Sequence, residues 1–371
     1  MRQKIGLLLF ALICSLSTTS AQYKFKNTIN LEQTPVKSQD RTGTCWSYST
    51  ASYMESEALR KHEKPVDLAE MFIVRYIYID KAKNYIHRQG KANFSQGGLA
   101  HDFMREMGRH GVVPQSVYDA RPKGEKIYDH DELAAVLKGY LDGVLEAKHP
   151  SPYWLDGFKA ILDVYLGKVP IMFKVDGQSY TPKTYAEKLG FDAKDYIELT
   201  SFTHHPFRHY FVLEIPDNYS NGLYYNIPLE DLKKQTDYAL EHGYTVSWDG
   251  DVSEKGFGRR EGVIVLPENN KDLDKDGIVK EMKVTQDLRQ KGYENWSTTD
   301  DHLMHIVGKA KDQKGNNYYI IKNSWGNRNG YDGLYYMSEA FFLMKTVAIM
   351  LPKEALMKSV MPDVFIPVSL D

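Results

Sequence analysis

The sequence predicts an α+β protein of two lobes, one mainly helical and one rich in strands. Apolar residues at helical spacing recur through most of residues 45–190, whereas short alternating runs separated by turn residues dominate from about residue 205. We find no internal repeat and no low-complexity linker in the sequence. The two lobes are therefore expected to pack against each other rather than to be strung along a flexible chain.

Helices account for the first half of the chain in this prediction. Helical spacing predicts one helix that starts at Cys45 and a second over residues 68–89. An amphipathic helix is expected over residues 99–111, where the final glycine marks its end. Residues 121–190 are expected to be mostly helical, with prolines as the breaks.

Strands dominate the second half of the chain. Runs rich in β-branched and aromatic residues, bounded by turn residues, predict strands. These runs cover residues 209–216, 222–228, 244–252, 261–267, 301–310, 316–325 and 333–338. One helix is expected among them, over residues 228–243.

The N-terminus has the pattern of an export signal. Arg2 and Lys4 precede an apolar run and a stretch of small residues that ends at Ala21. The apolar run is too short to span a bilayer. We therefore expect residues 1–21 to be a cleaved signal peptide, the protein to be periplasmic or extracellular, and no stable membrane insertion.

Charge and cysteine content limit the kinds of partner and the kinds of cysteine chemistry that the protein can have. The 47 basic and 49 acidic residues leave a formal net charge of −2, which argues against nucleic acid as the main partner. The two cysteines are Cys14 and Cys45, so removal of the signal leaves Cys45 alone and no intramolecular disulfide. A single thiol in an exported protein is either a buried apolar side chain or a reactive group.

The position of Cys45 favours a reactive thiol. A cysteine in the first turn of a helix meets the positive end of the helix dipole and unpaired backbone N–H groups, and both favour the thiolate. A nucleophilic thiolate also needs a base, a group that orients the base, and donors for the oxyanion. The sequence offers a candidate for each of these roles.

Three motifs resemble the papain-like cysteine peptidases: QDRTGTCWSYS at residues 39–49, DHLMHIVG at 301–308 and KNSWG at 322–326. The resemblance implies that Cys45 attacks the scissile carbonyl group and that Gln39 donates a side-chain N–H to the oxyanion. It also implies a Cys-His-Asn triad, a thioester intermediate, peptide substrates and no cofactor.

Two histidines, His302 and His305, compete for the role of the base. Three residues apart on a strand, they point to opposite faces, so only one can face the cleft. The spacing to Gly308 matches the family pattern for His302, which we expect to be the base. The resemblance implies that Asn323 accepts a hydrogen bond from this histidine and that Trp325 shields the bond from water.

The closer resemblance is to the bleomycin hydrolase and aminopeptidase C branch of this superfamily. It is carried by the long gap between Cys45 and His302, the helical insertion, and the segments that precede the histidine. The branch implies an aminopeptidase, in which the terminal carboxylate of a C-terminal arm holds the substrate's amino group. The tail PDVFIPVSLD does not align with that arm. A papain-like endopeptidase and a non-catalytic peptide-binding protein on the same fold stay as alternatives, and a homo-oligomer stays open.

The resemblance also implies a fold. We expect a papain-like two-lobe arrangement, with a helical lobe, an antiparallel β-barrel-like lobe and a helical insertion. The expected limits are residues 22–371 for the peptidase domain, divided into 22–120 for the helical lobe with the nucleophile, 121–200 for the helical insertion, and 201–371 for the β-rich lobe with the histidine and asparagine.

A glycine pair is the candidate for substrate binding. Gly97 and Gly98, in the motif SQGG, resemble the glycines at which the family's substrate backbone pairs in extended form. Glycine suits this role because no side chain obstructs the approach of another backbone. The alternative is an ordinary turn before a helix.

Two stretches imitate metal sites. Residues 272–277, with the sequence DLDKDG, resemble the opening of a calcium loop, but the twelfth position is Lys283 and not a bidentate carboxylate. His204 and His205 are adjacent, and no carboxylate or cysteine stands at metal-ligand spacing in the sequence. We expect an acidic solvated turn in the first case and no metal in either.

Overall fold

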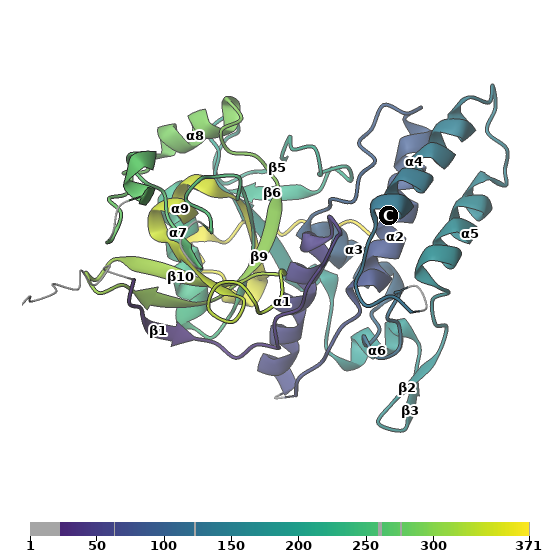
Figure 1. The fold of residues 1–371 in the computed structure, drawn as a ribbon, viewed down its shortest axis with the longest axis horizontal. Coiled ribbons are helices and arrows are strands. Elements are labelled where there is room, and N and C mark those ends of the chain that lie inside the picture. The colour runs from purple at the N-terminus through teal and green to yellow at the C-terminus, as the bar shows by residue number, and fades with distance from the viewer. Residues whose placement is uncertain (1–22, 63, 122–123, 259–261, 275–276, 371) are drawn as a thin grey trace, which may run out of the picture.

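A computed structural model describes residues 23–370 except 63, 122–123, 259–261 and 275–276. A helical lobe and a sheet-based lobe lie side by side, and helix α1 (Cys45–His62) runs between them (Figure 1). Every residue of α1 from Cys45 to Leu59 is buried, because the helix packs against other helices and against the sheet. The predicted start of a helix at Cys45 is confirmed.

Two further helices complete the helical lobe as predicted. α2 (Glu70–His87) and α3 (Ala100–His110) both pack against α1 and against each other. Gly111 ends α3 with a φ of 81°, in the left-handed region that favours glycine. Together α1, α2 and α3 form a layer that fixes the position of the Cys45 backbone.

The next segment adds helices on the outer side of α2. α4 (Asp131–Leu145) and α5 (Trp154–Leu166) each bury one stripe of apolar residues, spaced four apart. The buried residues of these stripes are Leu133, Leu137, Leu141, Phe158, Leu162 and Leu166. α2 lies between this pair and the rest of the lobe (Figure 1).

Residues 173–180 differ from the helical prediction. They form a hairpin of β2 (Phe173–Val175) and β3 (Gln178–Tyr180), followed by the short helix α6 (Pro182–Lys188). The turn between the two strands is Asp176-Gly177, and both residues have a positive φ. Asp-Gly between two short strands is a strong hairpin signal, and the helical interpretation overlooked it.

The second lobe is built on one large sheet. Its strands, in chain order, are β1 (Lys26–Asn30), β4 (Tyr196–Thr200), β5 (Tyr210–Val212), β6 (Leu223–Asn226), β7 (Val246–Gly250), β8 (Val263–Ile264), β9 (His302–Lys311), β10 (Asn317–Lys322), β11 (Leu334–Ser338) and β12 (Thr346–Pro352). Around it lie helices α7 (Leu229–Glu241), α8 (Gln286–Glu294) and α9 (Glu339–Lys345). Among the described residues, short 3-10 helices cover Ala193–Asp195, Asn270–Asp274, Lys353–Ala355 and Lys358–Val360.

The sheet is mixed and open. The strand order is β5-β6-β4-β12-β7-β9-β10-β11-β8, with β1 paired to β9. The pairs β4–β6 and β8–β11 are parallel and the others are antiparallel. The α+β two-lobe fold is as predicted, but the expected barrel-like closure is wrong, because β5 and β8 end the described sheet without pairing to each other.

The sheet places His302 and Asn323, the two site residues predicted in the β-rich lobe, next to each other. β9 begins at His302, and its neighbour β10 ends at Lys322, directly before Asn323. β9 and β10 run antiparallel, so the first residue of one strand lies near the last residue of the other.

The C-terminal tail leaves the sheet and crosses to the helical lobe, where its last described residues lie against α3. Leu370 packs against Gly108 of α3, and its carbonyl oxygen accepts a hydrogen bond of 2.6 Å from Arg109 Nε. The residues before it, Ile366 to Ser369, line a cavity with His101 and Arg105. The tail is thus held against α3.

Two expectations from the sequence concern the N-terminus and membranes. The predicted signal peptide, residues 1–21, lies outside the described residues. The predicted limits of the domain and of its parts are not tested and stay a prediction. Across the part of the chain that the structure describes, no helix combines the length and apolar character needed to cross a membrane.

Candidate active site

A groove of about 420 Å³ lies where the two lobes meet. The helical lobe contributes Gln39, Gly43, Cys45, Trp46, Gly97 and Gly98, and the second lobe contributes Asp217, Val252, Ser253, Asp300, Asp301, His302, Leu303 and Trp325. Six of the seven residues predicted for the site therefore line one groove, although they come from segments far apart in the sequence. The seventh, Asn323, lies directly behind His302.

Cys45 is the first residue of α1 and is almost completely buried, with 9% of its surface exposed. Burial raises the pKa of its thiol to about 12, and the backbone N–H groups of Leu303 and Trp46 only partly oppose this shift. The negative charge of Asp300 adds to the increase. The expectation of an ionised thiol is thus not met here, because desolvation outweighs the helix N-terminus and keeps the proton on sulfur.

His302 is held by one defined hydrogen bond. Its Nε2 lies 2.8 Å from Asn323 Oδ1, and an amide oxygen can only accept, so Nε2 carries the proton. The other ring nitrogen, Nδ1, is then the basic one. Burial lowers the pKa of His302 to about 4, and the hydrogen bond that His302 donates to Asn323 opposes this shift. His302 is therefore a neutral imidazole near pH 7.

The orientation of the Asn323 amide is fixed independently of His302. Its Oδ1 also accepts a bond of 2.7 Å from the backbone N–H of Ser324. Trp325 covers this pair, since its ring centroid lies 5.0 Å from that of His302. Trp325 is 39% exposed, whereas His302 and Asn323 are only 4% and 3% exposed, so solvent meets the indole ring but hardly reaches the pair behind it.

Gln39 is fixed at both ends of its side-chain amide. Its Nε2 donates to the carbonyl oxygen of Thr42 at 2.6 Å, and its Oε1 accepts from Ser324 Oγ at 2.6 Å. The backbone N–H of Gln39 also donates to the carbonyl oxygen of Ser324 at 2.8 Å. One N–H of the Gln39 amide is left for a group in the groove. These bonds tie the residue to the segment that carries Asn323.

The structure separates the two candidate histidines as the strand pattern predicts. His305 does not line the groove; its Nδ1 lies 2.9 Å from Ser52 Oγ on α1, and its ring meets Tyr53 edge to face. Burial lowers the pKa of His305 far below its usual value. This histidine is a neutral residue of the interface between α1 and the sheet.

Close packing leaves room only for glycine at both positions of the pair, Gly97 and Gly98. A side chain at Gly98 would come within 2.9 Å of the Trp46 ring, and one at Gly97 would overlap the carboxylate of Asp217. Trp46 is held in turn by a bond of 2.9 Å from its Nε1 to the carbonyl oxygen of Gln96. The pair is thus in place to offer backbone groups to the groove beside Cys45.

The two stretches that imitate metal sites differ in how far the structure describes them. Residues 275–276 lie outside the described residues, so the calcium-like stretch is not tested. At His204 and His205 the reasoning from spacing was wrong, because the fold brings Glu214 to 3.2 Å and 2.9 Å from their Nε2 atoms. Gln290 donates to His204 Nδ1, which puts the histidine proton on Nε2, where it faces Glu214.

The acidic residues of the groove were all missed at the level of the sequence: Asp217, Asp300 and Asp301. Asp300 and Asp301 directly precede His302, so their place beside the site could have been read from the motif. Asp217 lies in a loop after β5, and no signal in the sequence places it against Gly97.

Comparisons with known proteins identify the family and the fold of the chain. Residues 173–365 match the Peptidase C1-like family, and residues 22–136 match the papain family cysteine proteases. Aminopeptidase G of Lactobacillus delbrueckii subsp. lactis is 22% identical over 87% of this chain and 82% of its own length. Aminopeptidase E of Lactobacillus helveticus is 24% identical over 84% and 79%. The crystal structure of pepw from Lactobacillus rhamnosis has a TM-score of 0.73 at 19% identity, covering 90% of this chain and 83% of that one.

Proposed function

The chain belongs to the Peptidase C1-like family and is a cysteine-type peptidase, and from this premise we propose that Cys45, His302 and Asn323 form its catalytic triad. The observation that carries the proposal is the groove itself, which receives Cys45 from one lobe and His302 from the other. The resemblance to the aminopeptidase C branch, which the sequence predicted, is confirmed by these relatives.

In the proposed acylation step, the Cys45 sulfur attacks the carbonyl carbon of the scissile peptide bond while its proton passes to His302 Nδ1. A concerted transfer suits a site in which both groups are neutral, because no isolated buried charge has to form first. The oxyanion accepts bonds from the Gln39 side chain and the Cys45 backbone N–H. The C–N bond then breaks, His302 gives its proton to the leaving amine, and a thioester is left on Cys45.

In the deacylation step, water takes the place of the departed amine. His302 Nδ1 removes a proton from the water as its oxygen attacks the thioester carbon, and the C–S bond breaks. The proton returns to the Cys45 sulfur, so the enzyme is regenerated. Asn323 holds the imidazole ring in one orientation in both steps, while Gly97 and Gly98 pair with the backbone of the extended substrate.

For the mode of cleavage, we propose an aminopeptidase that acts after export through residues 1–21. The support is the naming of Aminopeptidase G and Aminopeptidase E among relatives that match over most of the chain. An endopeptidase is the second candidate, because the described C-terminal tail lies against α3 and no part of it lines the groove.

One experiment tests both the chemistry and the mode. The hydrolysis of a fluorogenic peptide with a free N-terminus is compared with that of the same peptide acetylated, under reducing conditions, with Cys45→Ala as control. We expect cleavage of the free peptide only and a loss of at least about 10³-fold in Cys45→Ala. Equal cleavage of both peptides would identify an endopeptidase, and an active Cys45→Ala variant would refute the cysteine nucleophile.

A further inference from the structure

Lys81 is a buried lysine that the proposed mechanism does not use. It lies on α2, none of its surface is exposed, and it is not among the residues that line the groove. Its Nζ donates to the carbonyl oxygen of Gly97 at 2.5 Å and to that of Ser95 at 3.4 Å. Because a lysine is almost never fully buried unless it is paired, its partners show what it is there to hold. Those partners are the loop that carries the glycine pair.

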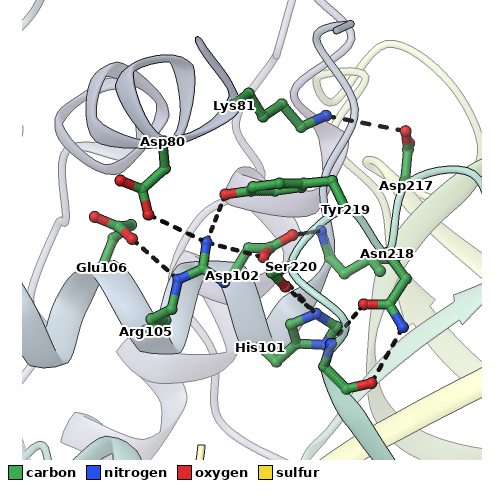
Figure 2. A network of polar contacts seen from close by, with 12 residues as sticks. Asp80, Lys81, His101, Asp102, Arg105, Glu106, Asp217, Asn218, Tyr219 and Ser220 are labelled. Carbon is green, nitrogen blue, oxygen red and sulfur yellow. Dashed lines mark hydrogen bonds and ion pairs between the residues drawn. The ribbon is translucent and has the colours of Figure 1, made fainter. Parts of the chain in front are cut away.

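A charged partner of Lys81 comes from the other lobe. Asp217 Oδ1 lies 4.0 Å from Lys81 Nζ, which in turn lies 5.1 Å from the centre of the Tyr219 ring (Figure 2). Burial lowers the pKa of Lys81, and the carboxylate of Asp217 is the first of the charges that oppose this shift. The same carboxylate packs against Gly97 and accepts a bond of 3.0 Å from Asn93 Nδ2. The contact between Lys81 and Asp217 therefore joins the two lobes at the glycine pair.

The loop that carries Asp217 is itself held by α3. The backbone N–H of Tyr219 donates to the carbonyl oxygen of Asp217 at 2.8 Å, and the Tyr219 hydroxyl accepts from Arg105 Nη2 at 2.5 Å (Figure 2). Arg105 belongs to α3, where its Nη2 also lies 3.3 Å from Asp102 Oδ1. The partner of Lys81 thus has a fixed place, so the lysine can hold the loop of the glycine pair against it.

The hydrogen bonds of this loop distinguish Gly98 from the residues before it. The carbonyl oxygens of residues 95–97 all accept from side chains, two of them from Lys81 and one, at 2.9 Å, from Trp46 Nε1. The backbone N–H and C=O of Gly98, although this residue is buried, meet no hydrogen-bond partner among the described residues. Buried backbone groups without partners are rare, so Gly98 is the member of the pair whose backbone is open to an extended peptide.

We propose that Lys81 is a positioning residue, which holds the carbonyl group of Gly97 beside Asp217 and so presents the backbone of Gly98 to the substrate. This role rests on the proposed function for the nature of the substrate, a peptide. Without the Lys81 ammonium group, two carbonyl oxygens lose their donor, and the loop has to move to find another. Lys81 therefore acts on the binding of the peptide backbone and not on the chemistry at Cys45.

Two covalent reagents separate peptide binding from the reactivity of the thiol. The full chain is treated with a peptidyl chloromethyl ketone, which carries a peptide backbone, and with iodoacetamide, which carries none; in each case the Cys45 sulfur displaces a halide. The ketone is used with a free and with an acetylated N-terminus, and the faster form is kept. Modification is read by mass spectrometry on the peptide that contains Cys45. The ratio of the ketone rate to the iodoacetamide rate, divided by the same ratio for a model cysteine peptide, is the normalised ratio that measures backbone binding.

Lys81→Met keeps a long side chain and removes the donor. We expect it to lower the normalised ratio about tenfold or more, while the iodoacetamide rate stays within about twofold. Lys83→Met is the matched control, because it removes the same charge from the same helix at a position that is 44% exposed and outside the groove. This control should leave the normalised ratio unchanged. Equal falls of both rates in Lys81→Met would mean that Lys81 only supports the fold, and would overturn the positioning role.

Asp217→Asn decides the matter if Lys81→Met does not fold. The side chain of Asp217 is 25% exposed, and asparagine keeps its size while removing the charge that faces Lys81. We expect the normalised ratio to fall several-fold, and an unchanged ratio would overturn the positioning role. Where both variants fold, the double variant should lose less than the product of the two single effects, because the two groups act as one contact. Effects that multiply in full would contradict this coupling.

The wild-type protein shows separately whether the proposed function holds. A normalised ratio near one for both ketones would mean that the groove does not bind a peptide backbone, which would refute the proposed function and the role of Lys81 with it. A high ratio in the wild-type protein that Lys81→Met leaves intact would overturn the role of Lys81 alone.

Discussion

At the scale of single residues, the groove brings together a thiol and an imidazole that are both neutral. Burial keeps the proton on Cys45 and keeps His302 uncharged, and these two shifts have the same cause. The polar contacts that counter burial come from defined donors and acceptors, chiefly Asn323 behind the imidazole ring. The protonation states of the two side chains are therefore set by their neighbours as much as by the two residues themselves.

The lowered pKa of His302 predicts how activity depends on pH. A histidine with its usual pKa of about 6.5 is mostly protonated at pH 5 and could not act as a base. With a pKa of about 4, His302 stays neutral at pH 5 and loses its basic form only as the pH falls through about 4. We expect kcat/KM for a neutral peptide to stay near its maximum at pH 5 and to fall below it. A profile whose acidic limb lies near pH 6.5 would contradict this.

Asn323 provides a second prediction at this scale. Asn323→Ala removes the acceptor of the His302 Nε2 proton, so the imidazole loses its fixed orientation and its pKa falls further. We expect kcat to fall about 10- to 100-fold, corresponding to one lost buried hydrogen bond, with little change in KM. Ser52→Ala, which removes the partner of His305, serves as the control, because it acts outside the groove and should leave kcat within about twofold. Equal losses of kcat in the two variants would argue against the triad.

At the scale of secondary structure, the sequence was informative where periodicity was strong. The start of α1 at Cys45, the amphipathic α3 and the strands β9, β10 and β11 all follow from spacing. β12 was missed because its residues, TVAIMLP, form a continuous apolar run without alternation, as expected of a strand buried on both faces. Such a run gives the same pattern as a buried helical segment, so periodicity could not identify it.

The loop before α3 provides a prediction for an element. In Gly98→Ala the new methyl group would lie 2.9 Å from the Trp46 ring, which must then shift next to Cys45. We expect kcat/KM to fall roughly tenfold or more, since small displacements of reacting groups have large effects on rate. Expressed as a free energy, the loss of kcat/KM should exceed the change in the free energy of unfolding.

Gly139→Ala is the matched control for that experiment. Gly139 is an exposed residue inside α4, where an added methyl group would meet nothing within 4 Å. Removing a glycine from a helix interior is expected to stabilise the protein by about 0.5–1 kcal/mol, with activity unchanged. Activity losses of similar size in both variants would show that Gly98 has no special place beside the site.

At the scale of the whole molecule, the site exists only because the two lobes meet. The sequence motifs identified Cys45, His302 and Asn323 one by one, and the sheet topology explains how the last two become neighbours. Asp217 could not be predicted, because its contact with Gly97 depends on a loop path that leaves no local signal. The open sheet was also beyond the sequence, since strand patterns do not specify whether the edges of a sheet meet.

The C-terminal tail provides a prediction at this scale. Deletion of residues 366–371 removes the contacts of Leu370 with Gly108 and Arg109, so we expect a lower melting temperature. Because the described tail lines a cavity other than the groove, the alkylation rate of Cys45 by neutral iodoacetamide should stay within about twofold. A tenfold change in that rate, at a temperature where the variant is folded, would mean that the tail acts on the groove.

Capture of the acyl-enzyme would show directly whether Cys45 is the nucleophile. The protein is quenched in acid during hydrolysis of a peptide p-nitrophenyl ester, and its digest is searched by mass spectrometry for the acyl group. We expect an adduct on the peptide that contains Cys45, no adduct and no turnover in Cys45→Ala, and a longer-lived adduct in Asn323→Ala. Turnover by Cys45→Ala, or an adduct on another residue, would contradict it.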